Sequence, residues 1–172
     1  ALALANAGVR VLMHGHAFAG EERIYVNQVL QSFGLQESES TAAADMALRE
    51  GNFAYMSLAA IHPTLADMMD LKYLLGLRSP VNTVVRMMNP YAAPHSVHGV
   101  FHRGYDELHM QACQILEDNS VLVFRGGNGE AEVNPERDVA LGKWQDQQAS
   151  WSQWSKAESS YKRCKENLDV SR

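Results

Sequence analysis

The stretch that joins two helix-like segments of this chain reads Gly76-Leu77-Arg78-Ser79-Pro80-Val81-Asn82-Thr83. Gly76 is predicted to end the first helix, residues 64–75, because glycine reaches the left-handed conformation that closes a helix. Pro80 is predicted to begin the second, which stops at Asn89-Pro90. Arg78 lies between them, and its planar guanidinium is suited to bind a phosphate or a carboxylate. The alternative role is structural, since a cation also stabilises the C-terminus of a helix.

Outside this stretch, short runs rich in β-branched and aromatic residues alternate with helical segments. The runs predicted to be strands are residues 9–13, 53–58, 97–101 and 121–124. This alternation predicts an α/β fold over residues 1–135, with a mostly parallel central sheet flanked by helices. Residues 136–172 combine three tryptophans, many Gln and Ser residues and a mixed-charge run. This composition favours a peripheral helical or partly disordered tail.

Composition limits the classes of function. The formal net charge of −5 gives no overall attraction to nucleic acid or to an anionic membrane. We expect a cytoplasmic protein without a membrane span, in which Cys113 and Cys164 are reduced thiols and one of them is buried. Residues 1–7 are predicted to be the last turns of a helix with an exposed apolar face, ended by Gly8. A chain that opens in this way is expected to be part of a longer protein.

Two pairs of side chains are candidate metal ligands. His14 and His16 lie two residues apart at the end of the first predicted strand, a spacing that zinc ligands use. The alternative is a loop histidine and a solvated one. Glu130 and Glu132 follow the fourth strand and offer oxygen ligands for Mg²⁺, or form a solvated turn. The glycine-rich run 125–129 before them predicts a tight turn, because no helix follows it.

Taken in order, these motifs resemble the anthranilate phosphoribosyltransferase-like family, glycosyltransferase family 3. Residues 9–15 are similar to its strand and Lys-His-Gly-Asn-Arg loop, and Ile61-His62-Pro63 is similar to its His-Pro segment. The stretch from Gly76 to Asn89-Pro90 resembles its Gly-x-Arg-Thr…Asn-Pro helix. Residues 121–132 resemble its strand and acidic metal-binding loop. The resemblance covers residues 1–135.

The resemblance implies the large α/β domain of the nucleoside-phosphorylase and anthranilate-phosphoribosyltransferase type of fold. By the same resemblance, the family's N-terminal helical domain, through which a homodimer would form, is expected to lie outside this chain. The family displaces pyrophosphate from phosphoribosyl pyrophosphate with anthranilate and uses Mg²⁺. By resemblance, His14, Gly15 and Arg78 bind the phosphate or phosphosugar at one rim of the sheet. Glu132 and, less directly, Glu130 would bind the metal.

The chain departs from the family pattern at charged positions. Met13, His16 and Ala17 replace the lysine, asparagine and arginine of the loop, and Ala131 replaces a metal carboxylate. A charge-assisted contact is worth roughly 1.5–3 kcal/mol, so these changes predict a degraded phosphoribosyl pyrophosphate and Mg²⁺ site. We therefore expect a transferase-like protein that binds phosphate or phosphosugar without the family reaction. The alternative is a non-catalytic DNA-binding protein on the same scaffold, with its basic face supplied by the rest of the protein.

Overall fold

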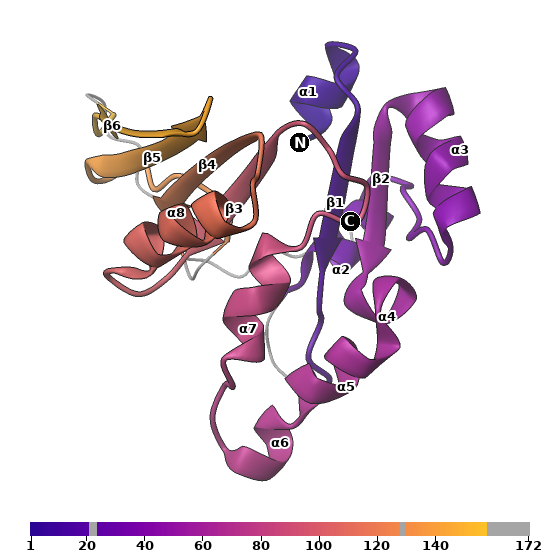
Figure 1. The fold of residues 1–172 in the computed structure, drawn as a ribbon. Coiled ribbons are helices and arrows are strands. Elements are labelled where there is room, and N and C mark those ends of the chain that lie inside the picture. The colour runs from indigo at the N-terminus through magenta and orange to yellow at the C-terminus, as the bar shows by residue number, and fades with distance from the viewer. Residues whose placement is uncertain (21–23, 128–129, 158–172) are drawn as a thin grey trace. The chain divides into compact units, whose positions relative to one another are not determined.

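The computed structural model describes residues 1–20, 24–127 and 130–157, which form two compact units (Figure 1). Unit 1 comprises Ala1–Val85, and unit 2 begins at Arg86. Each unit has its own sheet and its own buried core. In the part of the chain that the structure describes, no helix is long and apolar enough to cross a membrane.

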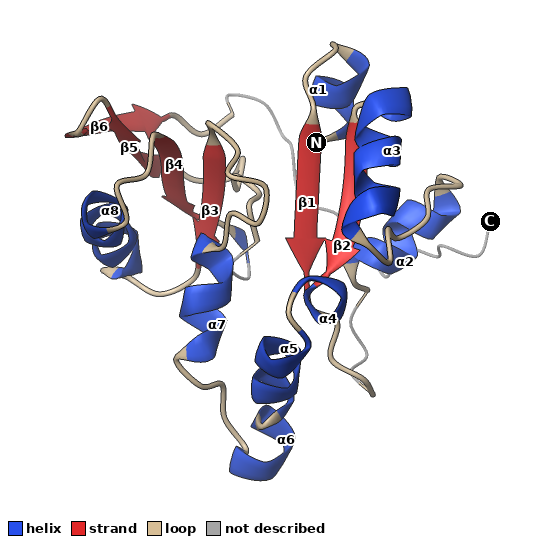
Figure 2. Cartoon of the chain, turned by 45° about the vertical axis from the view of Figure 1, so that its right-hand side comes forward, coloured by secondary structure: helices blue, strands red, loops and turns tan. Residues whose placement is uncertain are grey.

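The sheet of unit 1 consists of two parallel strands, paired from Val11 opposite Phe53 to Gly15 opposite Ser57. Its helices lie before, between and after these strands (Figure 2). The elements in chain order are α1 (Leu2–Asn6), β1 (Val11–Gly15), α2 (Val26–Ser32), α3 (Thr41–Gly51), β2 (Phe53–Ser57), α4 (Leu58–Ile61), α5 (Pro63–Asp70), α6 (Lys72–Leu75) and α7 (Val81–Val84).

Capping residues fix how α3 leads into β2. The Ser40 hydroxyl accepts a hydrogen bond from the Ala43 backbone N–H at 3.2 Å, which satisfies one free donor of the first turn. At the other end Asn52 adopts a left-handed conformation with φ of 56°, and β2 begins at the next residue. The core of the unit consists of Ala5, Leu30, Phe53 and Tyr55, with Leu2 packed against it.

The predicted helices on either side of Arg78 are present, but they are shorter than expected. Residues 64–75 form α5 and α6, with Leu71 between them, and Gly76 ends α6 with φ of 69° as predicted. Pro80 precedes α7, which continues as a short 3-10 helix, Val85–Met87, and stops before Asn89. Helix α1 is confirmed, with Leu4 exposed and Leu2 only partly buried.

Unit 2 contains a mixed sheet in the order β3-β4-β5-β6. Strands β3 and β4 are parallel and are connected by α8, whereas β4, β5 and β6 are antiparallel. The elements are β3 (Ser96–Val100), α8 (Tyr105–Ile115), β4 (Ser120–Arg125), β5 (Val139–Gln145) and β6 (Gln148–Trp154). Met110 and Cys113 of α8 pack with Val121 and Val123 of β4 and with Trp144.

One of the two cysteines belongs to this core. Cys113 is a free, fully buried thiol, as expected for one cysteine of the chain, while Cys164 lies outside the described residues. Burial, and then the nearby Asp118 carboxylate, raise the pKa of the Cys113 thiol to about 12. This cysteine is therefore a packing residue and not a nucleophile.

Two expectations about the sheet need correction. The four predicted strands are all strands, but they form two sheets, and only the pairs β1-β2 and β3-β4 are parallel. The expected helical or disordered tail also contains the hairpin β5-β6. Along β5, Gly142 and Trp144 are buried and alternate with the exposed Lys143 and Gln145, and Val139 is also buried. The polar composition of residues 136–157 masked this short alternation. The part of the tail from residue 158 onward lies outside the described residues.

A close backbone approach explains Gly126, which follows β4. A Cβ atom at this position would lie 1.7 Å from the Glu130 carbonyl oxygen, and at Gly99 of β3 it would lie 2.4 Å from the same oxygen. The Gly126 N–H donates to the Val100 carbonyl at 3.1 Å, and the Glu130 N–H donates to the Gly127 carbonyl at 3.0 Å. The predicted tight turn is thus confirmed at its described residues, and it lies directly against β3.

We expect Gly126→Ala to destabilise unit 2 by about 1–3 kcal/mol, the usual cost of forcing atoms into packed structure. The three tryptophans of the chain all lie on β5 and β6, so their fluorescence during urea denaturation reports on this unit. Gly51→Ala in unit 1 is the matched control, because a Cβ there meets nothing within 4 Å. An unchanged denaturation midpoint for Gly126→Ala would contradict the expectation.

Candidate anion-binding site

The candidate site of unit 1 is built on the loop that leaves β1. His14 and Gly15 are the last residues of this strand and pair with Met56 and Ser57 of β2. A Cβ on Gly15 would lie 3.2 Å from the hydroxyl oxygen of Tyr55, which is a close contact, so glycine allows the strand to end over this ring. The carboxyl ends of parallel strands are where open α/β sheets bind ligands.

Beyond Gly15 the chain places the ring of Phe18 in a buried position, with 7% of the residue exposed. Three side chains of basic residues lie around this ring. The His16 ring meets it edge to face with centroids 4.7 Å apart, the Lys72 Nζ lies 4.3 Å from its centroid, and the Arg78 Cζ lies 6.0 Å from it. We call Phe18, His16, Lys72, Tyr73 and Arg78 the Phe18 cluster.

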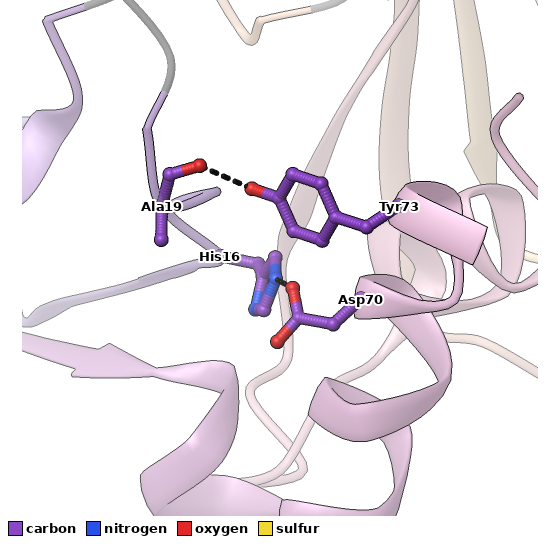
Figure 3. A network of polar contacts seen from close by, with 4 residues as sticks. All are labelled: His16, Ala19, Asp70 and Tyr73. Atoms are coloured by element: carbon purple, nitrogen blue, oxygen red, sulfur yellow. Dashed lines mark hydrogen bonds and ion pairs between the residues drawn. The ribbon is translucent and has the colours of Figure 1, made fainter. Parts of the chain in front are cut away.

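Two polar contacts connect the loop to the helices α5 and α6 (Figure 3). His16 Nε2 lies 2.9 Å from Asp70 Oδ1, and the Tyr73 hydroxyl donates to the Ala19 carbonyl. The His16 side chain is 11% exposed and that of Asp70 is 50% exposed. The Tyr73 ring also packs edge to face on Phe18, with centroids 6.2 Å apart. The loop is therefore held at both its polar and its aromatic residues.

The structure places Arg78 near the ring of Phe18, which is three residues beyond Gly15 in the loop that follows β1. Arg78 is exposed, and within the described residues it forms no ion pair. Its guanidinium therefore has donors available for an oxyanion. That Arg78, His14 and Gly15 bind phosphate stays a prediction.

The other predicted residues have different positions. His62 caps α5, where its Nδ1 accepts from the Leu65 N–H at 3.4 Å, which gives the His-Pro segment a structural role. Glu130 and Glu132 are exposed and belong to unit 2. In the mixed-charge run of the tail, Lys156 donates its backbone N–H to Asp138 Oδ1 at 2.8 Å, and residues 158–172 lie outside the described residues.

The metal sites predicted from the sequence can be tested by counting the ligand atoms that the structure brings together. Mg²⁺ prefers six oxygen ligands, and zinc prefers four nitrogen or sulfur ligands. Among residues 1–20, 24–127 and 130–157, no group of three or more His, Cys, Asp or Glu side chains is arranged to hold a metal ion. His16 is paired with Asp70, and Glu130 and Glu132 alone supply too few ligands. In the part of the chain that the structure describes, the predicted ligands are therefore not joined by enough further donors to complete either coordination shell.

Sequence reasoning missed several residues of the cluster. Phe18, Asp70, Lys72 and Tyr73 carry no motif, and the two contacts in Figure 3 each join residues 54 positions apart. Helical periodicity gives no signal for the helical side either, because Asp70 is the last residue of α5 and Tyr73 belongs to the separate helix α6. Nothing near either residue in the sequence reveals its partner in the loop.

Unit 2 contains a buried histidine pair that sequence reasoning also missed. His98 of β3 and His109 of α8 are 3% and 0% exposed, and their Nδ1 atoms lie 3.4 Å apart. Asp106, whose Oδ2 lies 3.7 Å from Arg125 Nε, and Arg86 are the charged residues that act on His109. Burial and then the Arg86 charge lower the pKa of His109 to about 4, against a smaller opposing effect of Asp106.

Comparison with solved structures defines the class of fold. The chain is similar to anthranilate phosphoribosyltransferase from Thermus thermophilus, with a TM-score of 0.69 and 22% identity over 88% of this chain and 45% of that chain. It is also similar to a variant of the Saccharomyces cerevisiae enzyme with Mg bound, with a TM-score of 0.65 and 12% identity over 90% and 42% of the two chains. The two sheets and their helices thus form part of the anthranilate phosphoribosyltransferase fold.

Sequence comparison supports the same relationship, although no family model matches the chain. Anthranilate phosphoribosyltransferase from Methylibium petroleiphilum is 28% identical over 142 residues, which is 83% of this chain and 41% of the relative. Anthranilate phosphoribosyltransferase 2 from Ralstonia nicotianae is 27% identical over 133 residues, which is 77% and 38%. The chain is therefore a distant homologue of anthranilate phosphoribosyltransferase, of glycosyltransferase family 3. It spans about 40% of the length of these relatives.

The buried histidine pair leads to a prediction about pH. The pKa of His109 is about 4 in the folded protein and about 6.5 when it is unfolded, so the unfolded chain binds the extra proton first. This stability term is complete above pH 6.5 and is lost as the pH falls towards 4, by roughly 3 kcal/mol in total.

Urea denaturation between about pH 4 and pH 7, followed by tryptophan fluorescence, measures this effect. His109→Asn removes the titrating group, so its free energy of unfolding should fall less steeply with decreasing pH than that of the wild type. Equal slopes for the two proteins would show that His109 does not control the acid sensitivity of unit 2.

Proposed function

We propose that this chain binds a phosphate or phosphosugar group at the Phe18 cluster and does not catalyse phosphoribosyl transfer to anthranilate. The observation that carries the proposal is the position of Arg78, which faces the ring of Phe18 in the loop that follows His14 and Gly15. The loop and the arginine are the two parts that the family resemblance assigns to one phosphosugar site. Distant homology to anthranilate phosphoribosyltransferase supports the kind of ligand.

The charges around Phe18 favour an anion. Lys72 and Arg78 both face the same aromatic ring, within 4.3 and 6.0 Å of its centroid, and a ring of this kind orients cations through its quadrupole. Arg78 is exposed, so its fork of N–H donors can reach an oxyanion without first leaving a carboxylate partner. A phosphate group carries the negative charge and the acceptor oxygens that such donors require.

Loss of the transfer reaction follows from the residues at the other family positions. Met13, His16 and Ala17 replace two cations and an amide of the loop, and Ala131 replaces a metal carboxylate. One solved relative has Mg bound, whereas among the residues that the structure describes here no group of three or more metal-ligating side chains is arranged to hold an ion. We therefore assign no step through a metal, and we attribute binding to the protein side chains alone.

Replacing Arg78 tests the binding site. We expect Arg78→Ala to weaken binding of inorganic phosphate and of ribose 5-phosphate about tenfold or more, because a charge-assisted hydrogen bond is worth roughly 1.5–3 kcal/mol. Arg78→Lys should retain part of the affinity, since it keeps the charge but not the planar fork. Isothermal titration calorimetry on the full chain gives both affinities.

Arg10→Ala is the matched control, because Arg10 is an exposed arginine before β1, at the end of the strand opposite to Gly15. Its affinity should equal that of the wild type. Equal phosphate affinity of Arg78→Ala and wild type would overturn the proposed site. A single-stranded DNA oligonucleotide, titrated in the same way, tests the alternative function: binding of DNA without binding of phosphate or ribose 5-phosphate would favour the nucleic-acid-binding scaffold.

The absence of transfer is a separate expectation. With phosphoribosyl pyrophosphate, anthranilate and Mg²⁺, the chain should consume no anthranilate above the protein-free background, as followed by anthranilate fluorescence. The reason is the loss of the loop charges at Met13, His16 and Ala17 and of the carboxylate at Ala131. The Thermus thermophilus enzyme serves as positive control. Measurable turnover by this chain would show that these positions are dispensable.

A further inference from the structure

His16 stands where the family pattern has an asparagine, and its ring is held in one orientation. Nε2 lies 2.9 Å from Asp70 Oδ1 (Figure 3). The ring also packs edge to face on the buried Phe18, and only 11% of the side chain is exposed. Among the described residues, these are the contacts of the His16 side chain. Nδ1 is therefore the ring nitrogen available to a ligand.

Asp70 decides which nitrogen of the neutral ring carries the proton. An ionised carboxylate only accepts hydrogen bonds, so the proton of a neutral His16 lies on Nε2, between the ring and Asp70. Nδ1 then presents a lone pair, which an anion cannot approach favourably. Nδ1 becomes a donor only when a second proton is bound and the ring is an imidazolium.

The charges near His16 make an anion the fitting partner for that second proton. Lys72 and Arg78 face the Phe18 ring that His16 also contacts, while Asp70 is the carboxylate on the opposite nitrogen. Tyr73 directs its hydroxyl to the Ala19 carbonyl, so it supplies no charge. His14 precedes the loop on β1. An anion placed among Lys72, Arg78 and His16 would stabilise the imidazolium, and the imidazolium would in turn attract the anion.

We propose that His16 is a ligand of the anion bound at the Phe18 cluster, that Asp70 is its positioning residue, and that binding takes up one proton at His16 Nδ1. The proposal rests on the proposed function, because it needs an anion at this site. The reactants of this step are the free dianion, the protein with a neutral His16 ring, and one proton from the solvent. The product is the bound dianion in contact with a protonated His16 ring. Relative to the family pattern, the loop has gained a proton-dependent ligand in place of a neutral amide.

Calorimetry with sulfate tests this coupling, because sulfate keeps its double negative charge over the neutral range. The binding heat is measured at about pH 7.5, where an ordinary histidine is mostly neutral, in buffers that differ in their enthalpy of ionisation. The dependence of the heat on the buffer gives the number of protons taken up. We expect a value approaching one for the wild type, and an affinity for sulfate that rises as the pH falls from 8 to 6.

Two variants separate the roles of the paired residues. His16→Asn restores the residue type of the family pattern, so sulfate should bind without proton uptake and with little dependence on pH. Asp70→Asn should retain binding but take up fewer protons than the wild type. The amide N–H can donate to Nε2 and leave the single proton of a neutral ring on Nδ1. A residue that only stabilised the loop would change the affinity without changing the number of protons.

The control is His95→Asn, which removes an exposed histidine of unit 2 and should leave proton uptake unchanged. Sulfate binding with the same heat in all buffers would overturn the coupling and leave the proposed function standing. The same conclusion would follow if Asp70→Asn took up as many protons as the wild type. If neither sulfate nor phosphate binds to the wild type, both proposals are wrong.

Discussion

Burial of the Phe18 ring is the interaction on which the candidate site of unit 1 depends. Lys72 Nζ and Arg78 Cζ lie 4.3 and 6.0 Å from the centroid of this one ring, so the ring gives two cationic side chains a common neighbour. The same ring orients His16 through an edge-to-face contact. Because Phe18 is in the loop that Gly15 begins, burying it also fixes the path of the chain beyond β1. The buried apolar ring of Phe18 is thus the common neighbour of three polar side chains, those of His16, Lys72 and Arg78.

In unit 2 the corresponding constraint is a close approach of backbones. Gly99 and Gly126 allow the Glu130 carbonyl to come nearer than any side chain would permit. Hydrogen bonds from Gly127 to Glu132 and from Glu130 to Gly127 then hold the two ends of the turn together. The turn is specified by its main chain, which leaves the carboxylates of Glu130 and Glu132 on the exposed side.

Features formed by residues close together in the chain could be predicted from the sequence, whereas features formed by contacts between distant residues could not. The strands β1 to β4 and the stop at Gly76 follow from local residue preferences, and the motifs correctly indicated the distant homology. The division into two sheets did not follow, because strand pairing is decided by contacts between distant segments. The hairpin β5-β6 was missed because its turn has positive φ at Asp146 and Gln147, without the glycine that usually marks such a turn. For the candidate site, the motifs point to Arg78 and His14, whose role in binding stays a prediction. Asp70 was missed because its partner His16 lies 54 residues away and no motif surrounds Asp70 itself.

The two contacts in Figure 3 have one more consequence, which concerns the tolerance of this region to changes in length. His16 and Ala19 are three residues apart in the loop, and their partners Asp70 and Tyr73 are also three residues apart in the helical segment. The two contacts therefore require the same spacing in both segments. One residue inserted between Asp70 and Tyr73, where α5 ends and α6 begins, would change the spacing of these two residues, so the two contacts could no longer form together. Residues 24–52, which lie between the two halves of this match, carry no such restriction from it. Related chains are therefore expected to vary in length between these two segments and to keep a constant length within each of them.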